Sequence, residues 1–285
     1  MKYRLENSNF IIQVESKGAE LENFISKKDN FEYIWQKDKN FWAKSSPILF
    51  PFVGGIKNER YFYDGKEYRI ETKHGFARDN EFVLSDKGEN YLEFLFESNE
   101  DTKKKYPFDF KLFLKYILDD NTLKMEYRVE NLTDGKMYFS LGAHPAFNVF
   151  GQPRENYIEF EKNEIGKSLT AESIGVTDKI RDIFEGNILR FTDETFKEDA
   201  IIFKNTNSKK VWLKSDKSDR IVEFDYNGFE YMAFWSVPKS GFVCLEPWDG
   251  LGDLVTSNGQ LTEKVGIKKL AKGEMYQKSI EIKIL

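Results

Sequence analysis

Apolar and polar residues alternate along much of the chain. Every second residue is apolar in residues 91–97, 110–118 and 122–130. A period of two places alternate side chains on opposite faces of the backbone, which is typical of half-buried β-strands. The sequence Asp-Asp-Asn at residues 119–121 separates two of these segments. We therefore expect them to pair as antiparallel neighbours joined by a tight turn.

The same pattern predicts strands in both halves of the chain. Asp64-Gly65 lies between two short aromatic segments and predicts a hairpin, because Gly readily takes the positive φ of such a turn. Further strands are expected at residues 9–14, 200–203, 210–214, 220–226, 231–236, 241–245 and 275–285. Short helical turns are expected near residues 40–42 and 192–196, and residues 153–191 are predicted to form long loops. These features indicate an all-β fold of antiparallel sheets, either a sandwich or a barrel.

Composition indicates one domain and argues against a nucleic-acid binding protein, and it leaves the fold prediction unchanged. No linker or composition break divides the sequence, so residues 1–285 are expected to form a single domain. The net charge is −5, and no basic block resembles a nucleic-acid binding surface. The chain has 26 Phe, 14 Tyr and 5 Trp, and such residues both favour strands and stack on sugars.

Cysteine content and the lack of long apolar segments indicate the cellular compartment. Cys244 is the single cysteine, so no disulfide can form within the chain, which suits a reducing compartment. The first ten residues contain no apolar stretch of signal-peptide length, and no segment is long and apolar enough for a spanning helix. We expect a cytoplasmic protein without membrane contact.

Two histidines and one glutamate are the candidates for chemistry. His74 precedes Gly-Phe-Ala-Arg, and His144 lies between an apolar segment and Pro145, where a strand should end. Glu246 follows the apolar residues 242–245 and precedes Pro-Trp-Asp-Gly. Partial burial there would raise the pKa of its carboxyl towards that of a general base. Taken singly, each histidine fits a structural role better than a functional one, whereas Glu246 fits either role equally well.

Several other kinds of site lack their sequence signals. Gly54-Gly55 does not have P-loop spacing, no Gly-x-Ser-x-Gly element is present, and His-Glu-x-x-His is absent. His74, His144 and Glu246 could in principle bind zinc, but they are far apart in the sequence. The apolar neighbours of Cys244 favour a buried, unreactive thiol.

Four ordered segments resemble the aldose 1-epimerase (galactose mutarotase) family, and within it the LacX-like branch. They are Ser-Pro-Ile-Leu-Phe-Pro-Phe-Val-Gly at residues 46–54 with Asn-Glu-Arg at 58–60, His-Gly-Phe-Ala-Arg at 74–78, Leu-Gly-Ala-His-Pro-Ala-Phe-Asn at 141–148, and Cys-Leu-Glu-Pro-Trp-Asp-Gly at 244–250 with Asp253. Phe-Trp-Ser-Val-Pro at 234–238 also fits.

The resemblance implies a galactose-mutarotase-like β-supersandwich that interconverts the α and β anomers of a free hexose. It implies that Glu246 takes the proton of the C1 hydroxyl, that His144 protonates the ring oxygen O5, and that His74 supports the same region. No cofactor or metal is implied. The residues expected to bind the sugar are Arg60, Arg78, Asp199, Phe147, Asn148 and Trp248.

Two alternatives remain open at this level. His74 stands alone before Gly-Phe-Ala-Arg, a form shared with hexose-6-phosphate 1-epimerases, and Arg60 and Arg78 with Lys57 and Lys73 nearby could bind a phosphate. The second alternative is a carbohydrate-binding or sensing protein without turnover, although binding alone does not require an acid–base pair. The oligomeric state is not predicted.

Overall fold

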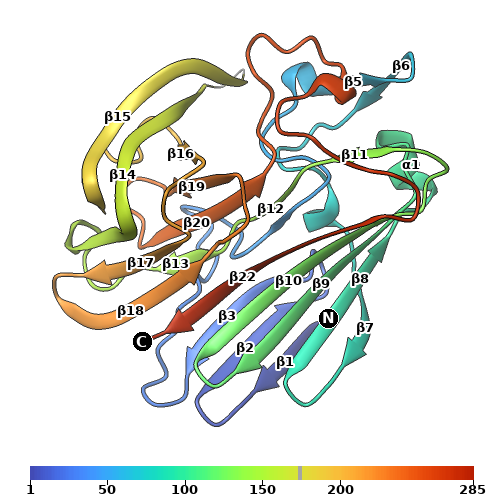
Figure 1. The fold of residues 1–285 in the computed structure, drawn as a ribbon. Helices are drawn as coiled ribbons and strands as arrows, with labels where there is room; N and C mark the ends of the chain where they lie inside the picture. The colour runs from blue at the N-terminus through green and yellow to red at the C-terminus, as the bar shows by residue number, and fades with distance from the viewer. Residues whose placement is uncertain (173–174) are drawn as a thin grey trace.

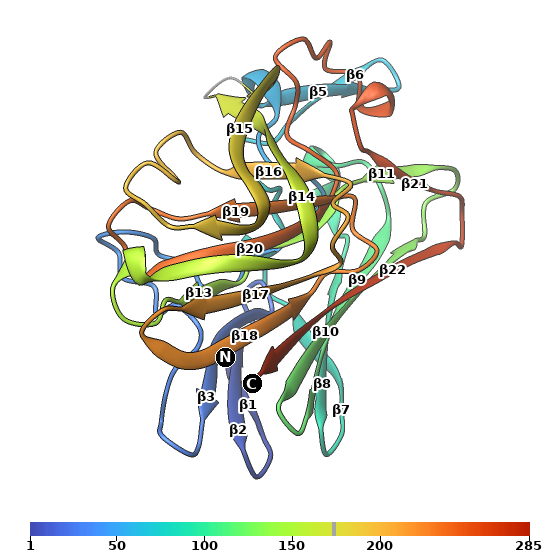
Figure 2. The same cartoon turned by 60° about the vertical axis from the view of Figure 1, so that its left-hand side comes forward.

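The computed structural model describes residues 1–172 and 175–285 and is built almost entirely from antiparallel strands (Figures 1 and 2). One long, curved sheet runs through the molecule. Its order is β4 (Ile48–Leu49), β12 (Leu141–Ala143), β20 (Phe242–Asp249), β19 (Tyr231–Trp235), β16 (Ile201–Lys204), β14 (Asn156–Glu172), β17 (Lys210–Ser215), β18 (Ser218–Asp225), β22 (Met275–Ile284), β10 (Thr122–Asn131), β9 (Phe110–Asp119), β8 (Tyr91–Glu97) and β7 (Val83–Lys87). In addition, β13 (Ala146–Asn148) pairs with β20, and β15 (Gly175–Arg190) pairs with β14.

Smaller elements complete the fold. A second sheet contains β1 (Lys2–Glu6), β2 (Phe10–Glu15) and β3 (Glu20–Ser26), and two short pairs are β5 (Arg60–Tyr63) with β6 (Lys66–Arg69) and β11 (Met137–Phe139) with β21 (Lys268–Leu270). The α-helix of the described residues is α1 (Glu100–Lys105), and 3₁₀ turns lie at Lys57–Glu59, Ala77–Asp79, Pro153–Glu155 and Leu261–Glu263. No helix in the described ranges has the length and apolar character needed to cross a membrane.

The alternating pattern predicted from the sequence is confirmed in the strand faces. Along β9 and β10, buried residues alternate with partly exposed ones, and the two strands pair in register from Thr122 opposite Asp119. β8 and β9 pack on the three-stranded sheet and on the turn that precedes β3. Tyr3 and Phe94 have ring centroids 5.3 Å apart, and the Tyr116 hydroxyl donates to the Ala19 carbonyl at 2.5 Å.

The predicted hairpin is also confirmed. Tyr63 pairs with Lys66 across Asp64 and Gly65, whose φ angles are 50° and 70°. Positive φ at both central residues is the geometry of a type I′ turn, which matches the twist of the flanking strands. The predicted helical turns near residues 40–42 and 192–196 are hydrogen-bonded turns rather than helices.

The prediction of long loops over residues 153–191 is wrong for the described part of that segment. The chain there forms β14 and β15, a long hairpin that extends towards the β5–β6 pair (Figures 1 and 2). The β14–β15 register shifts at three places, between Glu159 and Glu164, Gly166 and Lys167, and Leu169 and Thr170. Each shift breaks the period of two, which hides a strand from a pattern search. Residues 173 and 174, also covered by that prediction, lie outside the described residues.

Candidate active site

The strand β20 places His144 opposite Glu246. Residues 242–244 of β20 pair with β13, and residues 248–249 pair with β12. The connection between β12 and β13, His144-Pro145, therefore lies beside the centre of β20. The backbone N–H of Leu245 donates to the Pro145 carbonyl at 3.0 Å and holds the connection there. All eight residues of β20 are buried.

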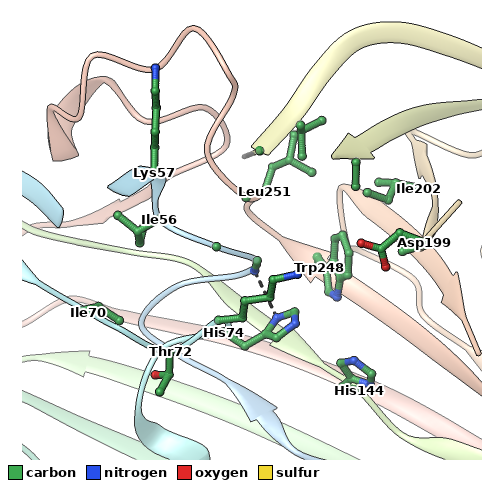
Figure 3. A pocket seen from close by; sticks show the side chains of 18 of the residues that line it. Ile56, Lys57, Ile70, Thr72, His74, His144, Asp199, Ile202, Trp248 and Leu251 are labelled. Atoms are coloured by element: carbon green, nitrogen blue, oxygen red, sulfur yellow. Dashed lines mark hydrogen bonds between the residues drawn. The ribbon is translucent and has the colours of Figure 1, made fainter. Parts of the chain in front are cut away.

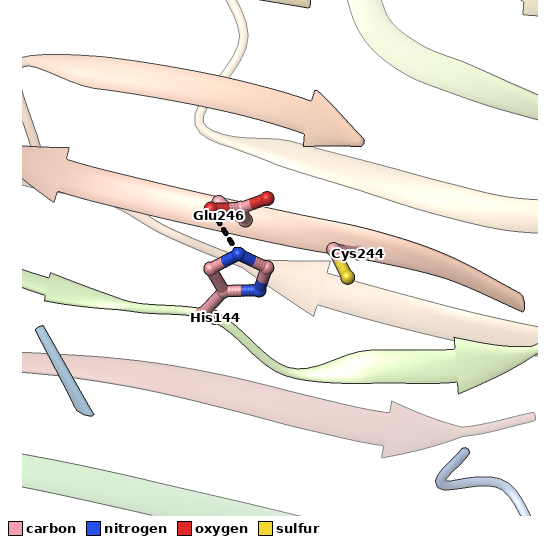
Figure 4. Close-up of side chains that lie close together, drawn as sticks. All are labelled: His144, Cys244 and Glu246. Carbon is pink, nitrogen blue, oxygen red and sulfur yellow. Dashed lines mark ion pairs between the residues drawn. The ribbon is translucent and has the colours of Figure 1, made fainter. Parts of the chain in front are cut away.

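The two side chains meet in the interior (Figure 4). His144 Nε2 lies 3.1 Å from Glu246 Oε2, and the side chains are 7% and 1% exposed. Burial raises the pKa of Glu246 well above its usual value of 4.5, and the charge of Asp199 raises it further. Burial lowers the pKa of His144 to about 3. The low-dielectric surroundings thus favour an uncharged pair, which holds one proton between the two groups.

His74 is fixed by the backbone of a neighbouring segment. The N–H of Gly54 donates to His74 Nδ1 at 3.1 Å, and the His74 N–H donates to the Gly54 carbonyl at 2.8 Å. His74 has a φ of +68°. The next residue must be Gly, because a Cβ on Gly75 would lie 2.3 Å from the Phe50 carbonyl oxygen. His74 is therefore held by backbone contacts on both sides.

The Gly54 contact determines the tautomer of His74. Burial lowers the pKa of His74 well below its usual value, and the charge of a protonated His144 would lower it further. A neutral ring that accepts at Nδ1 carries its proton on Nε2. The rings of His74 and His144 are 5.5 Å apart and nearly perpendicular. His74 is thus a hydrogen-bond donor beside the His144–Glu246 pair.

The three residues line one cavity of about 960 Å³ (Figure 3). Its walls come from β16, β19 and β20, from residues 54–59 and 70–74, and from the tip of the β14–β15 hairpin. Asp199 points into the cavity near Trp248. The indole N–H of Trp248 is buried and makes no well-formed hydrogen bond within the described residues, but it interacts with the Glu246 carboxyl closely enough to oppose the rise in its pKa. A buried donor without a well-formed hydrogen bond is costly to leave unsatisfied, so it is available to a ligand.

Six of the predicted site residues converge and three do not. His74, His144, Glu246, Arg78, Asp199 and Trp248 all line the cavity. The Arg60 guanidinium lies outside it, with Nη1 3.3 Å from Glu67 Oε2.

Phe147 and Asn148 also lie outside the cavity lining. Phe147 is fully buried beneath the site and packs on Phe224. The Asn148 side-chain amide donates to the carbonyls of Glu32 and Ile34 at 2.8 and 3.0 Å. These contacts give both residues structural partners outside the cavity.

Two tryptophans that the sequence did not single out surround His144. Trp42 is stacked on the imidazole with centroids 4.9 Å apart and an interplanar angle of 24°. Trp235 meets the same ring edge-on at 5.9 Å. Trp42 comes from the turn at residues 39–41, and its only sequence signal is an aromatic pair, Phe41-Trp42, within a polar segment. Trp235 lies in the Phe-Trp-Ser-Val-Pro segment of the family match.

A buried ion pair supports the cavity rim. Lys264 Nζ lies 2.5 Å from Asp253 Oδ1, and both side chains are 4% exposed. The other carboxylate oxygen of Asp253 accepts the backbone N–H of Lys57 at 2.9 Å. The backbone of Asp253 bonds to Gly55 and to Val176. One residue thus connects the segment at residues 54–57 with the tip of the β14–β15 hairpin.

Comparison with known proteins agrees with this geometry. The family model described as aldose 1-epimerase matches residues 1–267. Protein LacX, in a plasmid and a chromosomal form from Lactococcus lactis subsp. lactis, is 32% identical, with both chains covered over their full length.

Solved structures show the same fold. A galactose mutarotase-like protein from Lactobacillus casei superposes with a TM-score of 0.94 at 32% identity, covering all of both chains. A galactose mutarotase related enzyme from Lactobacillus acidophilus gives a TM-score of 0.93 at 29% identity, covering 100% of this chain and 97% of the other. The fold is therefore the expected galactose-mutarotase-like arrangement of antiparallel sheets, and the chain belongs to the aldose 1-epimerase family.

Proposed function

We propose that the protein is an aldose 1-epimerase that interconverts the α and β anomers of a free hexose. One observation carries this proposal. A carboxyl and an imidazole, Glu246 and His144, lie 3.1 Å apart on the floor of a cavity large enough for a hexose. The family's reaction needs one group to remove a proton from a sugar oxygen and one to deliver a proton to another.

Ring opening uses both members of the pair. The Glu246 carboxylate takes the proton from the C1 hydroxyl while the His144 imidazolium gives its proton to O5. The C1–O5 bond breaks, and C1 becomes the aldehyde carbon of the open chain. Rotation about C1–C2 presents the other face of the aldehyde, and the reverse transfers close the ring as the other anomer. Each positioned acid or base typically contributes about 10²–10⁴-fold to the rate.

The number of protons on the His144–Glu246 pair suits this reaction. The pair holds one proton when Glu246 is protonated and His144 is neutral, as burial favours. The reactive form, with a carboxylate and an imidazolium, has the same number of protons. Hydrogen bonds from a bound sugar replace the lost hydration of the carboxylate, so binding favours this form.

The surrounding residues support a sugar ring in the cavity. His74 can donate from Nε2, because its Nδ1 already accepts from Gly54. Arg78 and Asp199 supply donors and acceptors for hydroxyl groups, and the indole of Trp248 offers both a flat face and an N–H without a well-formed hydrogen bond.

The charges of the lining favour an uncharged sugar over a hexose phosphate. Lys57, Lys73 and Arg78 line the cavity, but so do Glu59, Glu71 and Asp199. The Lys57 ammonium is occupied by the carbonyls of Val255 and Ser257, at 2.6 and 3.2 Å. A phosphate site normally concentrates unopposed positive charge.

The assay follows the equilibration of pure α-D-glucose and α-D-galactose by polarimetry or NMR. We expect the protein to accelerate it, and Glu246→Gln to reduce the rate constant by about 10²-fold or more. Glu126→Gln, a similar change on β10 away from the cavity, serves as the control and should leave the rate unchanged. Equal rates for the wild type, Glu246→Gln and buffer would contradict the proposal.

Two further measurements separate the alternatives. A strong preference for glucose 6-phosphate over glucose would mean that Arg78, Lys73 and Lys57 bind the phosphate group of the substrate. Calorimetric binding of a sugar without any acceleration of anomer exchange would indicate a binding or sensing protein.

A further inference from the structure

Cys244 lies next to the acid–base pair but has no part in the proposed proton transfers. Cys244 and Glu246 are two residues apart on β20, so their side chains leave the same face of the strand. His144 faces both (Figure 4). One imidazole nitrogen, the thiol sulfur and one carboxylate oxygen all lie within 4.8 Å of one another, and all three residues are buried.

The polar atoms of His144, Cys244 and Glu246 have few hydrogen-bond partners within the protein. His144 Nδ1 is buried and has no hydrogen-bond partner among the described residues, and Glu246 Oε2 has only the His144 Nε2 contact at 3.1 Å. Cys244 is a free thiol with no exposed surface. Buried polar atoms are nearly always paired, so the unpaired His144 Nδ1, beside a free thiol and a carboxylate oxygen with a single contact, indicates a cluster that can bind a ligand.

The donor set has the chemistry of a zinc site. Thiolate, imidazole and carboxylate bind Zn²⁺ at roughly 2.3, 2.0–2.1 and 2.0–2.2 Å. These bond lengths separate tetrahedral ligands by roughly 3.3–3.8 Å, so small side-chain movements from the present spacing are sufficient. Three protein ligands leave a fourth position open, and two of the three, His144 and Glu246, line the cavity.

We propose that His144, Cys244 and Glu246 bind Zn²⁺ or a chemically similar divalent cation, and that the cation inhibits the enzyme in competition with the sugar. The inhibitory part rests on the proposed function, whereas the binding part does not. Binding releases two protons to solvent, one from the Cys244 thiol and one from the His144–Glu246 pair. The pair then has no proton to deliver to O5, and its carboxylate is no longer free to accept one.

The binding part is tested with Co²⁺ on the full-length protein. A thiolate bound to Co²⁺ gives a charge-transfer band in the near ultraviolet, and tetrahedral coordination gives intense visible bands. We expect both in the wild type and expect Cys244→Ala to lose the charge-transfer band. Cys244→Ser, which is closer in size, is a second variant, and circular dichroism confirms the fold of each. A Co²⁺ spectrum without the thiolate band, or one unchanged by Cys244→Ala, overturns the proposal.

The inhibitory part is tested by measuring anomer exchange at increasing Zn²⁺ concentration. Without metal, Cys244→Ala should retain the wild-type rate, because Cys244 transfers no proton. The Zn²⁺ concentration for half-inhibition should rise at least roughly tenfold in this variant, since loss of a ligand weakens the site. Equal inhibition of both proteins overturns the proposal. If the wild type lacks exchange activity, the proposed function fails, and the Co²⁺ spectrum still decides the binding part.

Discussion

The indole of Trp42 lies almost parallel to the imidazole of His144, with ring centroids 4.9 Å apart. The π-face of an indole attracts a cation placed over it by about 0.5–2 kcal/mol. In the proposed mechanism His144 carries a positive charge during ring opening, although burial disfavours that charge. The stack therefore stabilises the protonated form of the proposed acid, whose side chain is only 7% exposed.

Replacing Trp42 with Leu should lower kcat by about two- to thirtyfold, which corresponds to the loss of that interaction. Trp42→Phe retains an aromatic face and should retain most of the rate. Anomer-exchange kinetics over a range of sugar concentrations separate kcat from KM. A higher KM with unchanged kcat in Trp42→Leu would mean that Trp42 binds sugar and does not stabilise the imidazolium.

The pH dependence of the rate should reflect the burial of the His144–Glu246 pair. At their usual pKa values of 6.5 and 4.5, the two groups would hold one proton between about pH 4.5 and 6.5. Burial lowers the pKa of His144 to about 3 and raises that of Glu246, so the singly protonated state extends further in both directions.

We therefore expect kcat/KM at about pH 5 to stay within about twofold of its value near neutrality. Exchange rates corrected for the buffer reaction at each pH give this profile. A rate that falls as the pH rises through the usual histidine pKa would show that His144 is solvated in the working enzyme, contrary to its 7% exposure.

The elements that the sequence predicted well are those whose pattern depends on near neighbours. In β9 and β10 the alternation and the register agree, and the Asp64-Gly65 turn has the expected positive φ angles. The β14–β15 hairpin was missed because its register shifts break the alternation. Local pattern contains no information on such shifts, which depend on the partner strand.

In the site, too, local sequence features could be predicted, whereas long-range contacts could not. The rarity of His74 and His144 drew attention to them, but it was the family resemblance that placed His144 beside Glu246. The pairing of β12 and β13 with one strand explains that proximity, and it is a long-range feature. The stacking of Trp42 on His144 depends on a turn about a hundred residues away in sequence, so no local signal could reveal it.

Glu246 should reduce stability at neutral pH. Its pKa is raised in the folded state, so the folded protein keeps the proton while the unfolded chain loses it above about pH 4.5. The free energy of unfolding then falls as the pH rises, by up to about 1.4 kcal/mol per unit, until the raised pKa is reached.

Glu246→Gln removes this loss, because the amide cannot ionise. We expect the variant to be inactive but to have a higher Tm than the wild type at neutral pH, with the difference shrinking towards pH 4.5. Thermal unfolding at both pH values measures it. A Tm difference that stays constant with pH would show that the carboxyl titrates alike in the folded and unfolded states.

Lys264 and Asp253 should matter for both stability and substrate binding. Their ion pair is buried on both sides, and burial lowers the pKa of Lys264 although the Asp253 charge opposes this shift. Lys264→Met leaves the Asp253 carboxylate buried without its cation, which typically costs about 3–5 kcal/mol. The Asp253 contacts to Lys57 and Val176 lie at the cavity rim, so KM should rise as well.

Lys272→Met removes an exposed pair with Asp134 and is the matched control, expected to change neither the stability nor KM measurably. Urea unfolding and exchange kinetics on both variants test this, and equal losses in the two would mean that the buried pair has no special role in holding the rim.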